Sequence, residues 1–158
     1  MTYKRAYKFL LAVAGLHVQR QIKRSLENCD AYTLVKKFQQ LEEERVYTYH
    51  LFNEGHKLYL TSGYTHEPFV RFRQLVHEVT QEFKRISEEI SSIEKRLREE
   101  SGEAEISVAN LIAAVQEDEK NKLELTASIQ LAKQGYVSHP DEPERQVDMI
   151  TLRKRLIK

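Results

Sequence analysis

The chain has 158 residues, of which 31% are charged and 41% hydrophobic. This length accommodates one domain, and the few breakers, 5 Gly and 3 Pro, favour long helices and argue against a β-rich fold. The formal net charge is +1, but residues 1–26 carry six basic side chains and no acid, so residues 27–158 sum to −5. The single cysteine, Cys29, excludes an internal disulfide and favours a reducing compartment.

The N-terminal unit, placed at 1–28, is predicted to be a basic amphipathic helix. Its apolar run, 9–16, falls well short of the roughly 20 residues that a membrane-spanning helix needs, so no transmembrane segment is expected. Three interpretations stay open: a helix docked on the bundle, a mitochondrial presequence, or a secretory signal cleaved after Ala14.

A basic arm that touches phosphate groups is a fourth interpretation of this segment. Its contact with nucleic acid would be weak and without sequence preference, because no element is arranged to read base edges. The candidate phosphate-contacting residues are Lys4, Arg5, Lys8, Arg20, Lys23 and Arg24.

The core unit, placed at 29–135, begins with a helix predicted over roughly 31–62. Asp30 is its expected N-cap, and Gly63 lies just past its end. The apolar stripe of this helix is interrupted by polar Arg45 and Thr48. The residues of the stripe are Leu34, Phe38, Leu41, Arg45, Thr48, Phe52 and Tyr59.

A stripe of nine apolar residues, spaced alternately by three and four, predicts the next helix over roughly 68–100. Such a narrow seam is typical of helices that pack along one another like a coiled coil. A fourth helix is predicted over 107–134, with Ser107 as N-cap, a stripe beginning at Leu111, and a polar middle at Asp118 and Lys122. The nine residues are Phe69, Phe72, Val76, Val79, Phe83, Ile86, Ile90, Ile93 and Leu97.

The last unit, 136–158, is predicted to be a loop, 136–144, followed by a short helix. Short connections between the long helices favour antiparallel neighbours. The expected fold is therefore all-α: an elongated antiparallel bundle, with a coiled-coil-like hairpin, of three long helices and short flanking ones.

No catalytic, cofactor or metal motif is found along the chain. His77-Glu78-Val79-Thr80-Gln81 differs from the zinc-protease pattern at Gln81, and glutamine is a poor zinc ligand. Cys29 has no histidine nearby in sequence and is more typical of a small packed residue. We therefore expect no enzyme activity, no cofactor and no metal.

Two stretches, 54–63 (EGHKLYLTSG) and 76–83 (VHEVTQEF), go beyond generic helix. Together with 41–45 (LEEER) they resemble the Required for excision 1-B domain family, over roughly 34–134. The resemblance implies a role in DNA excision repair and no catalytic residues. The basic segment 1–26 is not part of it, and we expect the chain to stop before the family's usual acidic C-terminal helix.

The residues of this motif give a candidate partner-binding patch. Gly55 costs about 1 kcal/mol relative to Ala inside a helix, which is tolerable if another helix backbone crosses closely there. Two interpretations stay open: the histidines and tyrosine hydrogen-bond across the hairpin, or they form a polar patch that binds a partner. The patch consists of Gly55, His56, Tyr59, His77 and Gln81.

The resulting prediction is a non-enzymatic helical adaptor or scaffold, nuclear or cytoplasmic, that acts in DNA excision repair by resemblance. It would bind other proteins through its helical faces, with weak nucleic-acid contact through residues 1–26. The alternative is a structural subunit of a large multiprotein assembly, directed to mitochondria by the same segment. The partner and the oligomeric state stay open.

Overall fold

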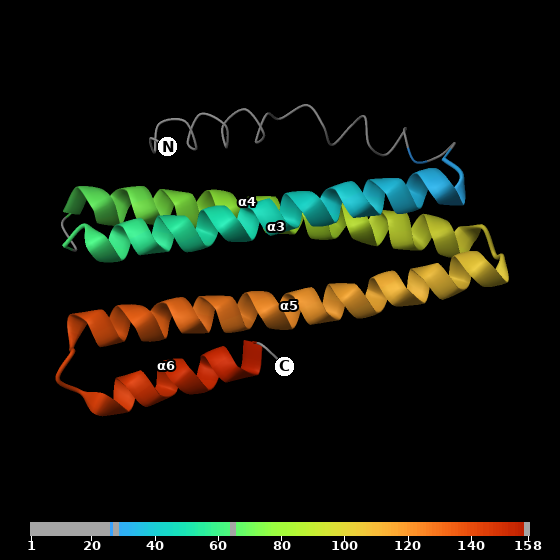
Figure 1. Ribbon diagram of the computed structural model, residues 1–158. Helices are drawn as coiled ribbons and strands as arrows, with labels where there is room; N and C mark the ends of the chain where they lie inside the picture. Colours follow the sequence, from blue (N-terminus) through green and yellow to red (C-terminus); the bar gives the residue numbers. More distant parts are fainter. Residues whose placement is uncertain (1–25, 27–28, 64–65, 157–158) are drawn as a thin grey trace.

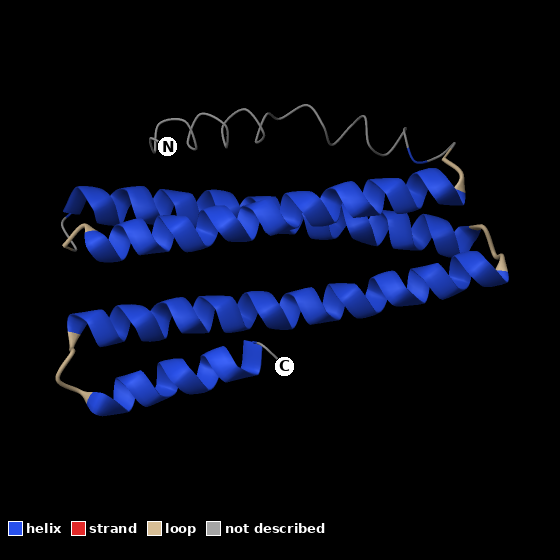
Figure 2. Ribbon diagram, in the orientation of Figure 1, coloured by secondary structure: helices blue, strands red, loops and turns tan. Residues whose placement is uncertain are grey.

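The computed structural model describes residue 26 and residues 29–63 and 66–156, and this part of the chain contains four helices and no strand (Figures 1 and 2). α3 and α4 form an antiparallel hairpin, α5 returns along it, and α6 folds back on α5 (Figure 1). The predicted all-α bundle with three long helices is confirmed. The helices are α3 (Ala31–Thr61), α4 (His66–Glu99), α5 (Glu103–Ser138) and α6 (Pro143–Leu156).

Both ends of α3 are capped by local hydrogen bonds. Thr33 N–H donates to the Asp30 side chain at 2.8 Å, and this bond lowers the pKa of the Asp30 carboxyl. At the other end the Ser62 hydroxyl and N–H donate to the Tyr59 carbonyl, at 2.6 and 3.2 Å. Gly63 follows with φ +74°, a conformation that glycine adopts without strain. Both predicted boundary residues, Asp30 and Gly63, are confirmed.

The apolar stripe of α4 is buried along most of its length, from Val79 to Leu97. Its first turns differ from the prediction, because Phe69 is 46% exposed while Leu75, which lies off the predicted stripe, is buried. The stripe of α3 is buried as predicted, apart from Phe38, which is half-buried against the core.

Two apolar clusters form the core. The larger lies where α4 turns into α5, contains Leu34 and Leu41 of α3, and also includes Leu26. The smaller, near the turn between α3 and α4, consists of Tyr49, Phe52, Leu75, Val79 and Phe83. Burial of these side chains, worth about 1.5–3 kcal/mol each, is the main stabilisation of the bundle.

A polar layer separates the two clusters, where the sequence predicts breaks in the stripes. Arg45, only 2% exposed, donates to Glu42 Oε1 at 2.9 Å and to Gln116 Oε1 at 2.5 Å. Gln116 in turn donates to the Ser87 carbonyl at 3.1 Å. The layer therefore ties α3, α4 and α5 together by hydrogen bonds instead of apolar packing.

Tyr49 extends this layer toward α5. Its hydroxyl donates to the Glu119 carbonyl at 3.2 Å, and the Lys122 ammonium lies 4.3 Å from its ring centroid. Burial, followed by the negative charge of Glu119, raises the pKa of the Tyr49 hydroxyl well above its usual value.

The position of α5 corrects three predictions. It begins at Glu103 instead of after Ser107, because Gly102 has the extended backbone of an N-cap and acidic residues fill the first turn. It continues through Gly135 to Ser138, where the His139 N–H donates to the Gly135 carbonyl. Its buried face carries Ala109 and Ile112, whereas Leu111 is exposed. The connection to α6 is correspondingly shorter than predicted.

Candidate functional site

Gly55 and His56 lie near the C-terminal end of α3, and both are buried. A Cβ atom on residue 55 would overlap Cδ2 of Leu75 from α4. The close approach expected at Gly55 is therefore made by a side chain and not by helix backbone. The same approach brings Leu75 into the core and turns the first part of α4 away from the predicted stripe.

His56 is 3% exposed, and its Nε2 atom has no hydrogen-bond partner among the described residues. Burial, and to a smaller extent the positive charge of Lys133, lower the pKa of His56 to about 4. The ring is therefore neutral at neutral pH. A buried polar atom without a partner costs about 1–3 kcal/mol, so this nitrogen is a feature that a ligand can satisfy.

Aromatic rings support His56 on the side of α4. The Phe72 ring lies 5.5 Å from the His56 ring and stacks on Tyr59 at 4.9 Å with an interplanar angle of 3°. Phe69 adds a tilted contact with Tyr59 at 6.2 Å. These contacts hold the imidazole in one orientation, toward α5.

His77 and Gln81 are not part of this group. Both are exposed, and each follows a buried residue, Leu75 or Val79, by two positions. Two positions correspond to about 200° of helical rotation, so these side chains lie on the opposite face of α4 from the core. The five residues predicted as one patch are thus divided between a buried group on α3 and an outer face of α4, and His77 is not placed to bond with His56.

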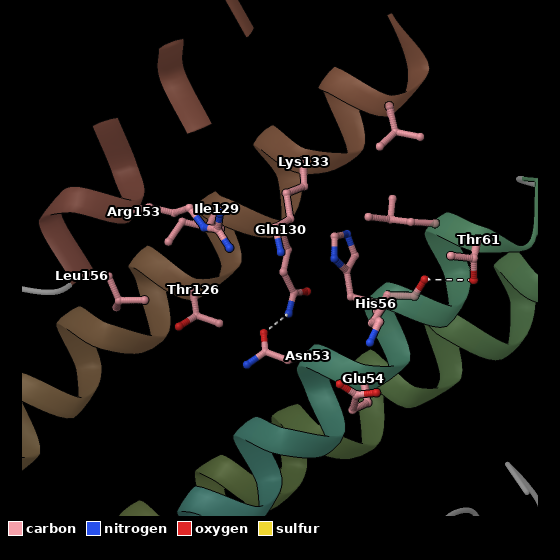
Figure 3. Close-up of a pocket in the computed structure, with 13 residues that line it drawn as sticks. Asn53, Glu54, His56, Thr61, Thr126, Ile129, Gln130, Lys133, Arg153 and Leu156 are labelled. Carbon is pink, nitrogen blue, oxygen red and sulfur yellow. Dashed lines mark hydrogen bonds between the residues drawn. The ribbon is translucent and has the colours of Figure 1, made fainter. Parts of the chain in front are cut away.

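A pocket of about 830 Å³ opens beside His56, between α3, α5 and the end of α6 (Figure 3). Figure 3 shows the imidazole projecting from α3 toward Gln130 and Lys133 of α5. The lining residues are Asn53, Glu54, His56, Lys57, Leu60, Thr61, Thr126, Ile129, Gln130, Lys133, Val137, Arg153 and Leu156.

A buried amide holds the two long helices together within the pocket. Gln130 Nε2 of α5 donates to Asn53 Oδ1 at 3.1 Å and to the Phe52 carbonyl at 3.5 Å. Because Gln130 is buried, losing these partners would leave an unsatisfied amide, which fixes the spacing of α3 and α5 at this point.

The lining combines positive charge with aliphatic surface. Lys57, Lys133 and Arg153 face a single acid, Glu54, and none of the three cations is in an ion pair with another described residue. The aliphatic part consists of Leu60, Ile129, Val137 and Leu156. Such a surface can hold an anionic group next to an apolar one.

The hydroxyls of the pocket are engaged by backbone. Thr126 Oγ1 donates to the Lys122 carbonyl at 2.8 Å, and Thr61 Oγ1 donates to the carbonyls of Lys57 and Leu58 at 3.2 and 3.1 Å. These atoms are not arranged as nucleophiles beside a base, which is the geometry that covalent catalysis requires.

A second pocket, of about 590 Å³, lies among α3, α4 and α5 beside the polar layer. Its surface is formed by Tyr49, Phe83 and Leu123, with Lys84 and Lys120 also on its lining. Together the two pockets mark where α5 lies less closely against the hairpin than it does near Ala109 and Ile112.

The sequence does not predict the pocket residues Asn53, Gln130 and Lys133. Polar residues at these positions are typical of solvent-facing helix positions, and no local signal marks them. The six predicted phosphate-contacting residues, Lys4, Arg5, Lys8, Arg20, Lys23 and Arg24, lie outside the described part of the chain, as does the predicted basic helix.

Two searches of the structure give negative findings. Within 29–63 and 66–156, no group of three or more His, Cys, Asp or Glu side chains is placed to hold a metal ion. No helix in the same ranges is long and apolar enough to cross a membrane.

Comparison with known proteins adds an independent observation. The sequence profile of the family described as DNA repair REX1-B matches residues 33–133. A mouse (Mus musculus) protein described as "Required for excision 1-B domain-containing protein" is 35% identical over 113 residues, which are 72% of this chain and 64% of the relative. The match therefore spans less than two thirds of that protein.

A Bos taurus protein of the same description is 46% identical over 48 residues, which are 30% of this chain and 26% of that protein. No solved structure matches the chain. The matched profile contains α3, α4 and the part of α5 that reaches Lys133, and so it includes His56 and most of the pocket.

Proposed function

Because the chain belongs to the DNA repair REX1-B family, we propose that it acts in DNA excision repair as a non-enzymatic adaptor that binds other proteins through its helical faces. The adaptor role is supported by one observation above all. The pocket beside His56 offers aliphatic walls and three cations that form no ion pair with any described residue, on the surface of a helical bundle, which suits recognition of another chain.

The absence of catalytic geometry in the pocket also favours an adaptor. Covalent catalysis places a nucleophile within hydrogen-bond reach of a base such as histidine, which a third group orients. In this pocket the threonine hydroxyls bond to helix carbonyls, and Glu54 is the one acid among the described residues of the lining.

Removal of DNA lesions in living cells tests the repair role. Cells that lack the protein should remove bulky lesions more slowly after irradiation, and the full chain should restore the rate. A matched control is the full chain with Ile90→Asp, which places a charge in the fully buried core and should fail to restore it. Unchanged lesion removal in the cells without the protein would contradict the proposal.

The rival function is that of a structural subunit of a large assembly in mitochondria. It is favoured by the basic segment 1–26, which has the acid-free composition of a mitochondrial presequence. Fluorescent tagging at the C-terminus separates the two functions. Nuclear signal supports the repair role, whereas mitochondrial signal that disappears on neutralising the six basic residues supports the rival. Affinity purification with mass spectrometry would then identify the partners.

A further inference from the structure

The pocket beside His56 combines three features that a surface of a helical bundle rarely shows together. One is a buried histidine nitrogen that has no partner among the described residues, one is a set of three cations with no ion pair within that part of the chain, and one is an aliphatic wall that includes exposed Val137 and Leu156. Each feature alone is unremarkable in a protein of this composition. Their convergence within one pocket indicates a binding site.

The positive charge is contributed by three separate helices. Lys57 comes from α3, Lys133 from α5 and Arg153 from α6. Glu54 is the one acid among the described lining residues, so the pocket carries a net positive charge, which attracts an anionic group. The charge of the pocket therefore specifies an acidic occupant, and it disfavours the chain's own segment 1–26, which carries six basic residues.

We propose that this pocket binds an acidic peptide segment of a partner protein, with its carboxylates paired to Lys133 and Arg153 and a neighbouring aliphatic side chain on the wall formed by Ile129 and Leu156. The Nε2 atom of His56 supplies one hydrogen bond to the segment. This inference rests on the proposed adaptor function and names the chemical class of its partner.

Two properties of the pocket favour a peptide over a nucleic acid. Proteins that bind single strands stack bases on aromatic side chains, and the lining contains no Phe, Tyr or Trp among the described residues. A volume of about 830 Å³ and aliphatic walls instead suit a few side chains of a peptide.

Selection from a random-peptide display library on the full-length protein tests the proposal. The enriched peptides should carry Asp or Glu next to Leu, Ile or Val. The charge-reversed variant K133E/R153E should bind the enriched consensus peptide at least about tenfold more weakly, as expected for the loss of about 1.4 kcal/mol of charge pairing.

The matched control is K120E/K154E, which makes the same change in charge on the same two helices at residues that do not line this pocket. It should bind the peptide within about twofold of the wild type, since neither side chain lines the pocket and exposed charges are screened by salt. Circular dichroism melts of both variants report whether each is folded. Enrichment of neutral or basic peptides, no enrichment at all, or equal binding by K133E/R153E would each overturn the proposal.

His56 gives a second readout. The imidazole proton resonances in NMR spectra should shift when the consensus peptide is added, and His56→Phe should weaken binding several-fold. A random 20-base-pair duplex serves as the competing ligand. If the duplex displaces the peptide from the wild type, and duplex binding itself is lost in K133E/R153E, the pocket is a nucleic-acid site and the peptide proposal is wrong.

Failure of this inference can be told apart from failure of the repair role. If K133E/R153E restores lesion removal in cells that lack the protein, the pocket is not the site of partner binding, although the repair role stands. If cells that lack this protein remove lesions at the normal rate, the repair role is wrong. The peptide-binding measurements in solution then decide the binding proposal alone.

Discussion

Leu75 of α4 occupies the space that Gly55 of α3 leaves open, and a methyl group on residue 55 would overlap its Cδ2 atom. This pair sets how closely the two helices of the hairpin approach next to His56. It also explains why the helix has a glycine where Ala would add about 1 kcal/mol of helix stability.

Gly55→Ala should lower the free energy of unfolding by about 1 kcal/mol, because overpacking costs about 1–3 kcal/mol and the gain in helix propensity offsets part of it. In a Leu75→Ala background the clash disappears, and Gly55→Ala should stabilise the protein. Urea unfolding of all four variants, followed by circular dichroism, measures both effects. The same effect of Gly55→Ala in both backgrounds would show that Leu75 is not the cause.

The buried His56 should make stability depend on pH. Its pKa in the folded protein is about 4, below the usual value of 6.5, so the folded state binds fewer protons than the unfolded state. Its contribution to stability is therefore complete above pH 6.5 and is lost as the pH falls toward 4, by up to roughly 3 kcal/mol.

Substitution of His56 isolates this effect from the carboxylates that titrate in the same range. His56→Phe removes the titrating group, so the variant should lose less stability than the wild type between pH 7 and pH 4. Urea unfolding at several pH values gives the two curves. Parallel curves would mean that His56 takes up no additional proton on unfolding.

The polar layer predicts coupling between Arg45 and Gln116. Arg45→Met leaves the carboxylate of Glu42 and the amide of Gln116 without their buried donor, which should cost about 3 kcal/mol. Adding Gln116→Leu removes one of the two orphaned groups, so the double variant should be more stable than the sum of the single changes predicts. A double-mutant cycle by urea unfolding measures the coupling, and strict additivity would contradict a shared network.

Contact with nucleic acid should depend on the basic residues of segment 1–26. With all six side chains on phosphates, affinity for a random duplex would fall with a log–log salt slope of roughly −5, and about half of that is a realistic value. Replacing the six residues with Gln should abolish binding. Substitution is preferable to deletion of 1–26, because Leu26 is part of the core.

Fluorescence anisotropy at two salt concentrations measures this slope. Neutralising Arg153, Lys154 and Arg155 at the other end of the chain is the control, and it should leave most of the affinity intact. Undiminished duplex binding after the six substitutions would move the contact to the folded part of the protein.

Local patterns along the chain are enough to predict the helices and the hairpin. The stripe from Val79 to Leu97 and the caps Asp30 and Gly63 depend on local geometry, 3.6 residues per turn and a few hydrogen bonds, which a single sequence carries. The buried face of α5 is harder to predict, because the apolar run 111–115 is compatible with two neighbouring stripes. Packing on α4 selects Ile112 and exposes Leu111, and no local rule makes that choice.

Long-range packing determines which residues make up the site. His77 and Gln81 belong to the same motif as His56 in sequence, yet they lie on the outer face of α4, off the stripe through Val79 and Phe83, whereas His56 is buried. Conversely, His56, Lys133 and Arg153 share one pocket although they are far apart in the chain. Their proximity depends on where α5 and α6 fold back on the hairpin. That arrangement is fixed by long-range packing and by the buried Gln130–Asn53 hydrogen bond. The spacing of apolar residues along the sequence does not predict such contacts.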